Sequence, residues 1–264
     1  MRSLADSTIT RDGRMLVLAM DHGMEHGPSD FTPVPETLDP ETVFDIATHD
    51  GVTSIAVQKG IAETYYPSYE DDVSLIVKLN GNTNLRMGEP MSPLTCSVEY
   101  AAEIGADAVG YTLYPGSNHE PEMFETFREV QEEARKFGLP VMAWAYPRGQ
   151  GVRDDTDPET IAYGARVALE LGADVGKVKY PGSLESMEWA IRSAGEMGIL
   201  LSGGSREGDE AFLSRVRRAL DAGATGLAVG RNVWQRERPN RILDALEDLV
   251  FDDAPVDASL EVTA

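Results

Sequence analysis

The chain has 264 residues, a formal net charge of −22 and a single cysteine, Cys96. This length can bury a sizeable core in one large domain, and one cysteine excludes an intramolecular disulfide, which fits a reducing cytoplasm. So negative a surface repels nucleic acid and anionic lipid. Because there is also no signal-peptide core and no apolar run of roughly 18 residues, we expect a cytoplasmic protein that binds neither nucleic acid nor membrane.

The basic residues are mostly arginine. Arginines far outnumber lysines, of which there are only five, Lys59, Lys78, Lys136, Lys177 and Lys179. Abundant Asp and Glu with scarce Lys favours adaptation to a high-salt cytoplasm, where ions screen the repulsion between surface charges; an ordinary acidic protein is the alternative. Because lysines are so few, each one within an apolar segment is a candidate for a chemical role.

Eight short apolar runs alternate along the chain with longer segments of helical periodicity. The runs have the length of strands buried on both faces, and they cover 15–20, 52–57, 74–79, 108–114, 141–146, 175–178, 199–202 and 226–229. Several helical segments end in a glycine just before the next run, as at Gly105, Gly172 and Gly223, where a left-handed residue can close a helix. This repeated helix–glycine–strand unit predicts a parallel sheet.

Eight such units in this length favour closure into a single α/β domain, a (β/α)8 TIM barrel over residues 1–251. The alternative is an open doubly wound sheet. However, the segment after the first run, 21–27, lacks the glycine spacing of a dinucleotide-binding loop. Residues 252–264 are acidic and rich in small side chains, so we expect a flexible C-terminal tail.

The first motif follows the first run, at the end of a strand where barrels of this kind carry their chemistry. Asp21, His22 and His26 fall close together there. The two imidazoles could bind zinc, but Gly23 and Gly27 favour a loop over a helix that presents both rings on one face, so we expect no metal. The other interpretation is a loop in which Asp21 caps backbone amides.

The fifth run carries two aromatic side chains and an arginine. Trp144 and Tyr146 point the same way because side chains alternate along a strand. They face either the barrel interior or the surrounding helices, and aromatic residues in a buried strand often serve only as core. Arg148 follows a proline at the exit of the strand, where its guanidinium suits an anion.

The sixth run gives the sharpest signal, because Lys177 and Lys179 share one face of an apolar strand. Buried amines are costly unless they have a function, and two that face inward would disfavour each other's protonation. An uncharged amine is a nucleophile. The alternative is a pair that reaches solvent or binds Asp and Glu. Lys59 and Lys78 are lesser candidates, and Lys136 looks structural.

The seventh and eighth runs end in glycine-rich segments. Ser202, Gly203 and Gly204 follow one run, and Gly230 and Arg231 follow the other. The loops after the last two strands form the recurrent phosphate site of this barrel, because glycine lets backbone N–H groups approach an oxyanion and the next helix adds a favourable dipole. Arg231 adds a fixed positive charge.

Taken together, these residues resemble the archaeal-type class I fructose-bisphosphate aldolases over nearly the whole chain. The segments that carry the resemblance are 20–23, 80–81, 110–117, 146–149 and 230–235. The resemblance implies that Lys177 is the Schiff-base lysine, Tyr146 the acid/base group and Asp21 the strand-one aspartate. Spacing alone does not choose between Lys177 and Lys179; the resemblance does. One departure is Tyr180, near a position where the family usually has threonine.

The resemblance also implies a reaction. The expected activity is reversible cleavage of fructose 1,6-bisphosphate to dihydroxyacetone phosphate and glyceraldehyde 3-phosphate in glycolysis and gluconeogenesis, with no cofactor and no metal. The sugar phosphate is expected to contact the two glycine-rich segments and further side chains, namely His22, His26, Trp144, Arg148, Lys179 and Arg231. The family also implies a homo-oligomer.

Three other functions stay open. A sister branch with the same barrel is 2-amino-3,7-dideoxy-D-threo-hept-6-ulosonate synthase, which shares the lysine, the 146–149 motif and the phosphate loops, although Trp144 and the 25–28 stretch look more like the fructose-bisphosphate branch. The second is a metal-dependent aldolase that uses His22 and His26. The third is a sugar-phosphate binder without catalytic activity.

Overall fold

The protein folds into a closed barrel of eight parallel strands, each paired with its neighbours in chain order, β1-β2-β3-β4-β5-β6-β7-β8. The computed structural model describes Leu4 and residues 7–263. The strands are β1 Met15–Ala19, β2 Ser54–Gln58, β3 Ser74–Lys78, β4 Ala108–Leu113, β5 Val141–Ala145, β6 Val175–Val178, β7 Gly198–Ser202 and β8 Gly226–Val229. The predicted (β/α)8 barrel is confirmed, and each predicted apolar run coincides with a strand to within a few residues.

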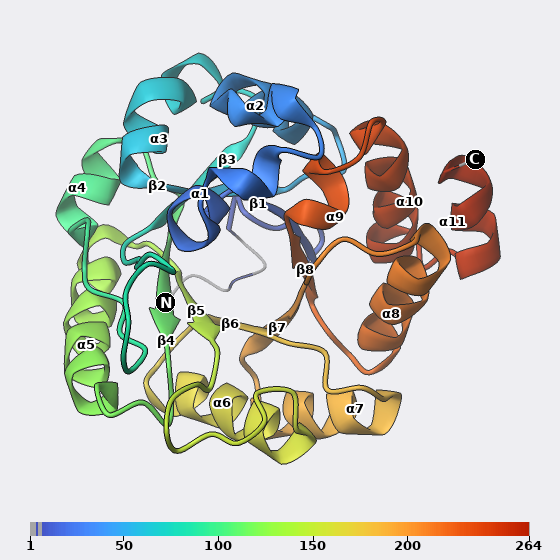
Figure 1. Ribbon diagram of the computed structural model, residues 1–264. Coiled ribbons are helices and arrows are strands. Elements are labelled where there is room, and N and C mark those ends of the chain that lie inside the picture. The colour runs from blue at the N-terminus through green and yellow to red at the C-terminus, as the bar shows by residue number, and fades with distance from the viewer. Residues whose placement is uncertain (1–3, 5–6, 264) are drawn as a thin grey trace.

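Helices surround the barrel (Figure 1). The α-helices are α1 His22–His26, α2 Pro40–Ala47, α3 Lys59–Tyr65, α4 Val98–Glu103, α5 Glu120–Phe137, α6 Pro158–Glu170, α7 Leu184–Ser193, α8 Asp209–Asp221, α9 Arg231–Trp234, α10 Pro239–Phe251 and α11 Val256–Thr263. Short 3-10 helices cover Pro28–Phe31, Pro35–Leu38 and Tyr66–Ser68. Among the described residues, no helix combines the length and apolar character that a membrane span requires.

Local sequence sets the helix ends. The carboxylate of Asp157 caps α6 by accepting a hydrogen bond from the amide of Thr160 at 3.0 Å. The predicted glycine closures are confirmed, since Gly105, Gly172 and Gly223 all adopt positive φ, at 86°, 88° and 101°. A residue with a Cβ would be strained there, so these glycines let each helix turn directly into the next strand.

Alternating strand residues build two separate packing layers. Leu16 and Leu18 of β1 face outward and belong to the large core between barrel and helices, whereas Met15 and Val17 face the barrel interior. Trp144 of β5 also fills the interior, and Gly110 of β4 makes room for it, because a Cβ at that position would lie 2.3 Å from the ring. The interior is therefore a packed core and not an open pore.

Two segments differ from expectation. Residues 22–26 form a single helical turn, α1, which ends at Gly27 with φ 85°, so one internal glycine does not prevent a helix this short. The C-terminal segment, expected to be flexible, forms α11 over Val256–Thr263 and packs against α8 and α10. Its apolar Val256 and Leu260 recur at helical spacing and contact the core, and this burial outweighs the low apolar content of the tail.

Candidate active site

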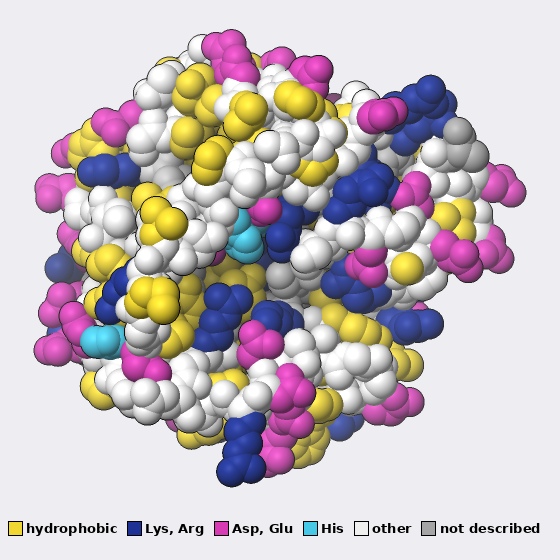
Figure 2. Space-filling model, viewed as in Figure 1, with side chains coloured by type: hydrophobic (Ala, Val, Ile, Leu, Met, Phe, Trp, Pro, Cys, Tyr) yellow, Lys and Arg dark blue, Asp and Glu magenta, His cyan; other side chains and the backbone are white. Residues whose placement is uncertain are grey.

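A cavity of about 420 Å³ opens at the carboxyl ends of the strands. Figure 2 shows the mouth of the barrel as a hollow where Lys, Arg and His side chains gather, although Asp and Glu are spread over the surrounding surface. Every residue that the sequence predicted for the site lines this cavity: Asp21, His22, His26, Trp144, Tyr146, Arg148, Lys177, Lys179, Ser202, Gly203, Gly204, Gly230 and Arg231. A protein that is acidic overall thus concentrates cations at one opening, which suits an anionic ligand.

Lys177 lies on the inner face of β6, and only 4% of its surface is exposed. It is paired in register with Trp144 of β5, and its Nζ atom lies 5.0 Å from the centroid of that indole ring. Within the described part of the chain, no carboxylate lies at ion-pair distance from this amine. A buried amine that is not held in an ion pair can approach a substrate carbonyl as a nucleophile.

Lys179 is different from Lys177 although both line the cavity. It lies just beyond the end of β6, its side chain is 28% exposed, and its ammonium group donates to the carboxylate of Asp155. The same carboxylate lies 3.8 Å from Nε of Arg148. The sequence left a nucleophile or an acid-paired lysine open for both positions; Lys179 is acid-paired, and Lys177 is the buried amine without such a partner.

A third lysine, Lys78, lies inside the barrel at the end of β3 and is fully buried. Its Nζ atom lies 3.3 Å from Oδ2 of Asp21 and 3.0 Å from Oε1 of Glu25. Burial opposes the charged form of Lys78, but Glu25 and Asp21 more than offset this and raise the pKa of the amine. Lys78 is therefore held as an ammonium ion, so its role is electrostatic and not nucleophilic.

Asp21 follows β1 and is 4% exposed. Burial alone would raise its pKa, but the positive charges of Lys78 and then Lys177 outweigh that effect and hold the pKa below the ordinary value for aspartate. The carboxylate therefore stays ionised at neutral pH. A buried negative charge beside Lys177 can stabilise a positive charge that forms there, such as that of a protonated imine.

The two histidines of the first motif approach each other. Their ring centroids lie 5.3 Å apart because both belong to the single turn of α1, contrary to the expectation that they would not share a face. Burial lowers the pKa of His22 to about 3, and the charge of Lys177 adds to this while Asp21 opposes it. In the part of the chain that the structure describes, no cluster of three or more His, Cys, Asp and Glu side chains is arranged to hold a metal ion.

Tyr146 follows β5, and its side chain packs against the interior cluster that includes Trp144. Its hydroxyl donates a hydrogen bond of 3.3 Å to Oγ of Ser202, the last residue of β7. The guanidinium carbon of Arg148 lies 5.5 Å from the centroid of the tyrosine ring. The hydroxyl therefore lies at the boundary between the lysine and the glycine-rich loop, where it can exchange protons with a substrate that spans both.

Side chains from α8 and α9 hold the loop after β7 in place by donating hydrogen bonds to its carbonyl groups. Asn232, fully buried on α9, donates through Nδ2 to the carbonyls of Gly203 at 2.9 Å and Ser205 at 2.8 Å. Its Oδ1 atom accepts from the amide of Glu207 at 3.0 Å. Arg215 of α8 donates to the carbonyl of Gly203 at 2.8 Å. With these carbonyls engaged elsewhere, the loop can present N–H groups to an anion.

The loop after β8 completes this part of the cavity. Gly230 allows close packing, since a Cβ there would lie 2.5 Å from Cε1 of His22 and 2.7 Å from the carbonyl oxygen of Ala19. Arg231 begins α9 and lies 3.6 Å from Oδ2 of Asp30. Glycine is thus required at 230 for steric reasons, and the arginine next to it supplies the positive charge.

Sequence reasoning missed Glu25, Asn232 and Arg215 and ranked Lys78 too low. Only Lys78 gave a usable signal, because it stands at the end of an apolar run in a chain with few lysines. Glu25 lay in the motif but had no visible partner, and Asn232 and Arg215 become important only when α9 and α8 meet the loop after β7. Such contacts depend on tertiary packing that a motif does not encode.

A buried amine on an inner strand, next to a carboxylate, a tyrosine hydroxyl and two glycine-rich loops, defines a barrel enzyme equipped for imine chemistry. The chain belongs to the DeoC/LacD aldolase family, whose model matches residues 15–236.

Individual relatives agree with this assignment. The chain is 60% identical to fructose-bisphosphate aldolase class 1 of Halobacterium salinarum over 98% of this chain and 99% of the relative. It is 49% identical to the protein of the same name from Thermoproteus tenax, over 91% of each. It is 36% identical to 2-amino-3,7-dideoxy-D-threo-hept-6-ulosonate synthase of Halobacterium salinarum, over 96% of this chain and 92% of the relative.

A solved structure is also similar along nearly its whole length. An archaeal fructose-1,6-bisphosphate aldolase, described as having its catalytic lysine covalently bound to the carbinolamine intermediate of the substrate, has a TM-score of 0.90 and 46% sequence identity. The match covers 94% of this chain and 98% of that chain.

Proposed function

We propose that this protein is a class I fructose-bisphosphate aldolase that cleaves fructose 1,6-bisphosphate to dihydroxyacetone phosphate and glyceraldehyde 3-phosphate through a Schiff base on Lys177. One observation carries the proposal: the buried Lys177 amine, which has no carboxylate partner among the described residues, opens into the same cavity as the two glycine-rich loops. A phosphate on those loops would place a neighbouring carbonyl within reach of the amine.

The first half of the reaction forms the imine. The amine of Lys177, in its unprotonated form, attacks the C2 carbonyl to give a carbinolamine. The carbinolamine takes up a proton from a general acid and loses water, which gives a protonated imine. Asp21, which stays ionised, stabilises that positive charge. The C1 phosphate binds the N–H groups of the loops and Arg231, so that C2 is held against the amine.

The second half breaks the carbon–carbon bond. A base takes the proton of the C4 hydroxyl, the C3–C4 bond breaks, and its electrons enter the imine to give an enamine while glyceraldehyde 3-phosphate leaves. Protonation at C3 and hydrolysis then release dihydroxyacetone phosphate and free Lys177. We assign these proton transfers to the hydroxyl of Tyr146, which lies between the lysine strand and Ser202.

The remaining predicted residues would hold the distal part of the substrate. Arg148 and His26 line the cavity and can contact the second phosphate, while Lys179 and Asp155 form a charged pair at the rim. His22 is neutral and can donate or accept a hydrogen bond to a hydroxyl. Trp144 supplies an apolar wall beside the amine.

The sister transferase reaction is the second candidate, since it would use the same lysine. Sequence similarity favours the aldolase, because identity is 60% to a protein named fructose-bisphosphate aldolase class 1 and 36% to one named as the synthase, both from Halobacterium salinarum. We also propose that the chain forms a symmetric homo-oligomer and acts in a high-salt cytoplasm. Light scattering, and thermal unfolding at increasing KCl concentration, test these two points.

The decisive assay follows cleavage of fructose 1,6-bisphosphate by the purified protein through coupled reduction of the triose phosphates. We expect turnover by the parent, none by Lys177→Ala, and unchanged turnover by the matched control Lys136→Ala, which removes an exposed lysine from α5. A folded parent that turns over the transferase substrates but not fructose 1,6-bisphosphate would refute the aldolase assignment.

A further inference from the structure

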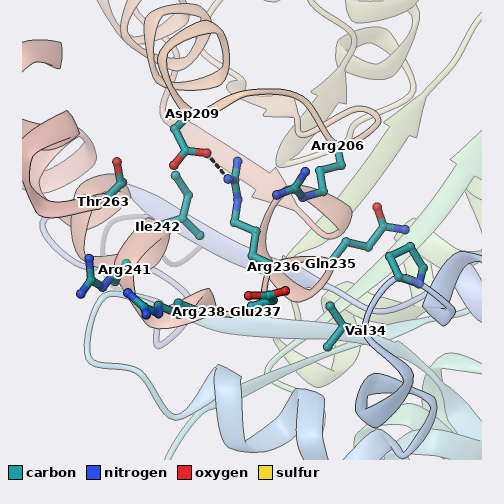
Figure 3. Close-up of a pocket in the computed structure, with 11 residues that line it drawn as sticks. Val34, Arg206, Asp209, Gln235, Arg236, Glu237, Arg238, Arg241, Ile242 and Thr263 are labelled. Atoms are coloured by element: carbon teal, nitrogen blue, oxygen red, sulfur yellow. Dashed lines mark hydrogen bonds and ion pairs between the residues drawn. The ribbon is translucent and has the colours of Figure 1, made fainter.

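A second cavity, of about 450 Å³, lies beside the active site, between the loop after β7 and the segments around α9, α10 and the end of α11. Four arginines line it, namely Arg206, Arg236, Arg238 and Arg241. Figure 3 shows Arg206 and Arg236 on one side of the cavity, and Arg238 and Arg241 together on the opposite side next to α10. None of these side chains is used by the proposed reaction.

Two carboxylates, Asp209 and Glu237, also line the cavity, so the four arginines are only partly balanced. Within residues 4 and 7–263, Arg206, Arg238 and Arg241 have no carboxylate at ion-pair distance, although the chain carries 45 Asp and Glu against 23 Lys and Arg. Elsewhere many arginines find an acidic partner, such as Arg166 with Glu170 at 2.7 Å and Arg217 with Asp221 at 2.9 Å. Three unpaired guanidinium groups around one cavity therefore stand out in so acidic a protein.

Arg236 lines the cavity and is held in place by several hydrogen bonds. It is 7% exposed, and it donates to the carboxylate of Asp209 and to the carbonyl of Asn232 at 2.6 Å. It also donates to the carbonyl of Glu207 at 3.3 Å. Burial lowers the pKa of Arg236, and the like charge of Arg206 adds to that effect, although Asp209 opposes both. Like charges held this near one another favour an anion between them.

The backbone next to the cavity also favours an anion. Helix α10 begins at Pro239 after Arg238, and no side chain caps its first turn in the described structure. The N-terminus of a helix of this length carries a partial positive charge and unpaired N–H groups. Arg238, just before the helix, and Arg241, in its first turn, both line the cavity.

We propose that this cavity is a second anion site, separate from the catalytic one, which takes an extended small molecule that bears two or more phosphate groups. Arginine pairs with phosphate through two parallel N–H···O bonds, so guanidinium groups on opposite sides suit a ligand with a negative charge at each end. The volume of the cavity is close to that of the active site, which is large enough for a hexose bisphosphate on the proposed function.

Calorimetric titration with inorganic tripolyphosphate tests this. The active site is first blocked by borohydride reduction in the presence of dihydroxyacetone phosphate, and untreated protein is titrated in parallel, so that binding at the glycine-rich loops is separated from binding at the second cavity. We expect the blocked parent to bind one tripolyphosphate per chain. Arg206→Ser/Arg241→Ser should weaken that binding at least about tenfold, and Arg206→Ser alone should weaken it less.

The matched control is Arg135→Ser/Arg218→Ser, which removes the same charge from two exposed arginines on α5 and α8. It should change affinity by less than about twofold, and circular dichroism confirms that each variant is folded. Equal loss of tripolyphosphate affinity in both double variants would show that net charge alone causes the effect, and this would also overturn the proposal. Absence of binding to the blocked parent, or unchanged affinity in Arg206→Ser/Arg241→Ser, would overturn the proposal.

Discussion

The Nζ atom of Lys78 lies 3.3 Å from Oδ2 of Asp21 in the interior of the barrel, where the lysine is fully buried and the aspartate nearly so. This ion pair links the ends of β3 and β1 and also includes Glu25, at 3.0 Å from the same amine. Because Lys78 keeps Asp21 ionised, the pair determines the charge that Lys177 faces.

Replacement of Lys78 by methionine tests this link. The variant leaves Asp21 buried without its main counter-charge, so the pKa of Asp21 should rise and its negative charge should be lost as the pH falls. We expect kcat to decrease about tenfold or more at pH 6 and the acidic limb of the pH profile to move to higher pH. An acidic limb in the same place as that of the parent would contradict the electrostatic role.

The same variant should also be less stable, because removal of one partner from a buried ion pair costs about 3–5 kcal/mol. The control is Lys59→Met, which removes an exposed lysine that likewise follows an apolar run. Chemical denaturation should show a large loss for Lys78→Met and a change below about 0.5 kcal/mol for Lys59→Met.

His22 should make the protein sensitive to acid. Its pKa in the folded protein is about 3, below the usual 6.5, because burial disfavours the protonated ring. The unfolded chain therefore binds a proton at His22 that the folded chain does not. Stability due to this group is complete above pH 6.5 and is lost as the pH falls toward 3, by up to about 1.4 kcal/mol per pH unit.

Titration of the histidine ring signals by NMR checks the value directly, since the His22 signal should not shift between pH 5 and 8. The variant His22→Gln removes the group, so its unfolding free energy should depend less steeply on pH below 6.5. A His22 signal that titrates near 6.5 would show that the ring is not held neutral by burial.

Asn232 should be a positioning residue for the phosphate loop. The variant Asn232→Asp keeps the size of the side chain but replaces the donor to the carbonyls of Gly203 and Ser205 with an acceptor, so these contacts become repulsive. We expect the KM for fructose 1,6-bisphosphate to rise about tenfold, with a smaller change in kcat. The control Asn118→Asp makes the same change at an exposed asparagine and should leave both constants within about twofold.

Tyr146→Phe separates proton transfer from binding. The ring and its packing stay, but the hydroxyl that contacts Ser202 is lost. Removal of a general acid/base should lower kcat about 10²- to 10⁴-fold, while the KM changes little. Tyr163→Phe on α6, where the side chain is 70% exposed, serves as the control. A Tyr146→Phe enzyme with near-parental kcat would assign the proton transfers to another group.

The sequence predicted the barrel well because its strands and helix ends are encoded locally. Uninterrupted apolar runs mark strands buried on both faces, and glycines such as Gly172 mark helix ends whatever the rest of the chain does. The C-terminal segment was harder to predict, since the helix at Val256–Thr263 depends on contact with α8 and α10 and not on its own composition.

The residues of the site could likewise be predicted only in part. Residues at the ends of strands could be found because the fold itself brings those ends together, and all of them line one cavity. The difference between Lys177 and Lys179 could not be derived from spacing. It arises from Asp155, which pairs with Lys179 from a loop 24 residues earlier in the chain.

The most direct test of the central claim is borohydride reduction of the protein with dihydroxyacetone phosphate, followed by mass-spectrometric mapping of the modified peptide. The account predicts one adduct per chain, on Lys177, its absence in Lys177→Ala, and its retention in Lys179→Ala. An adduct on Lys78 or Lys179, or no adduct in a folded and catalytically active protein, would contradict it.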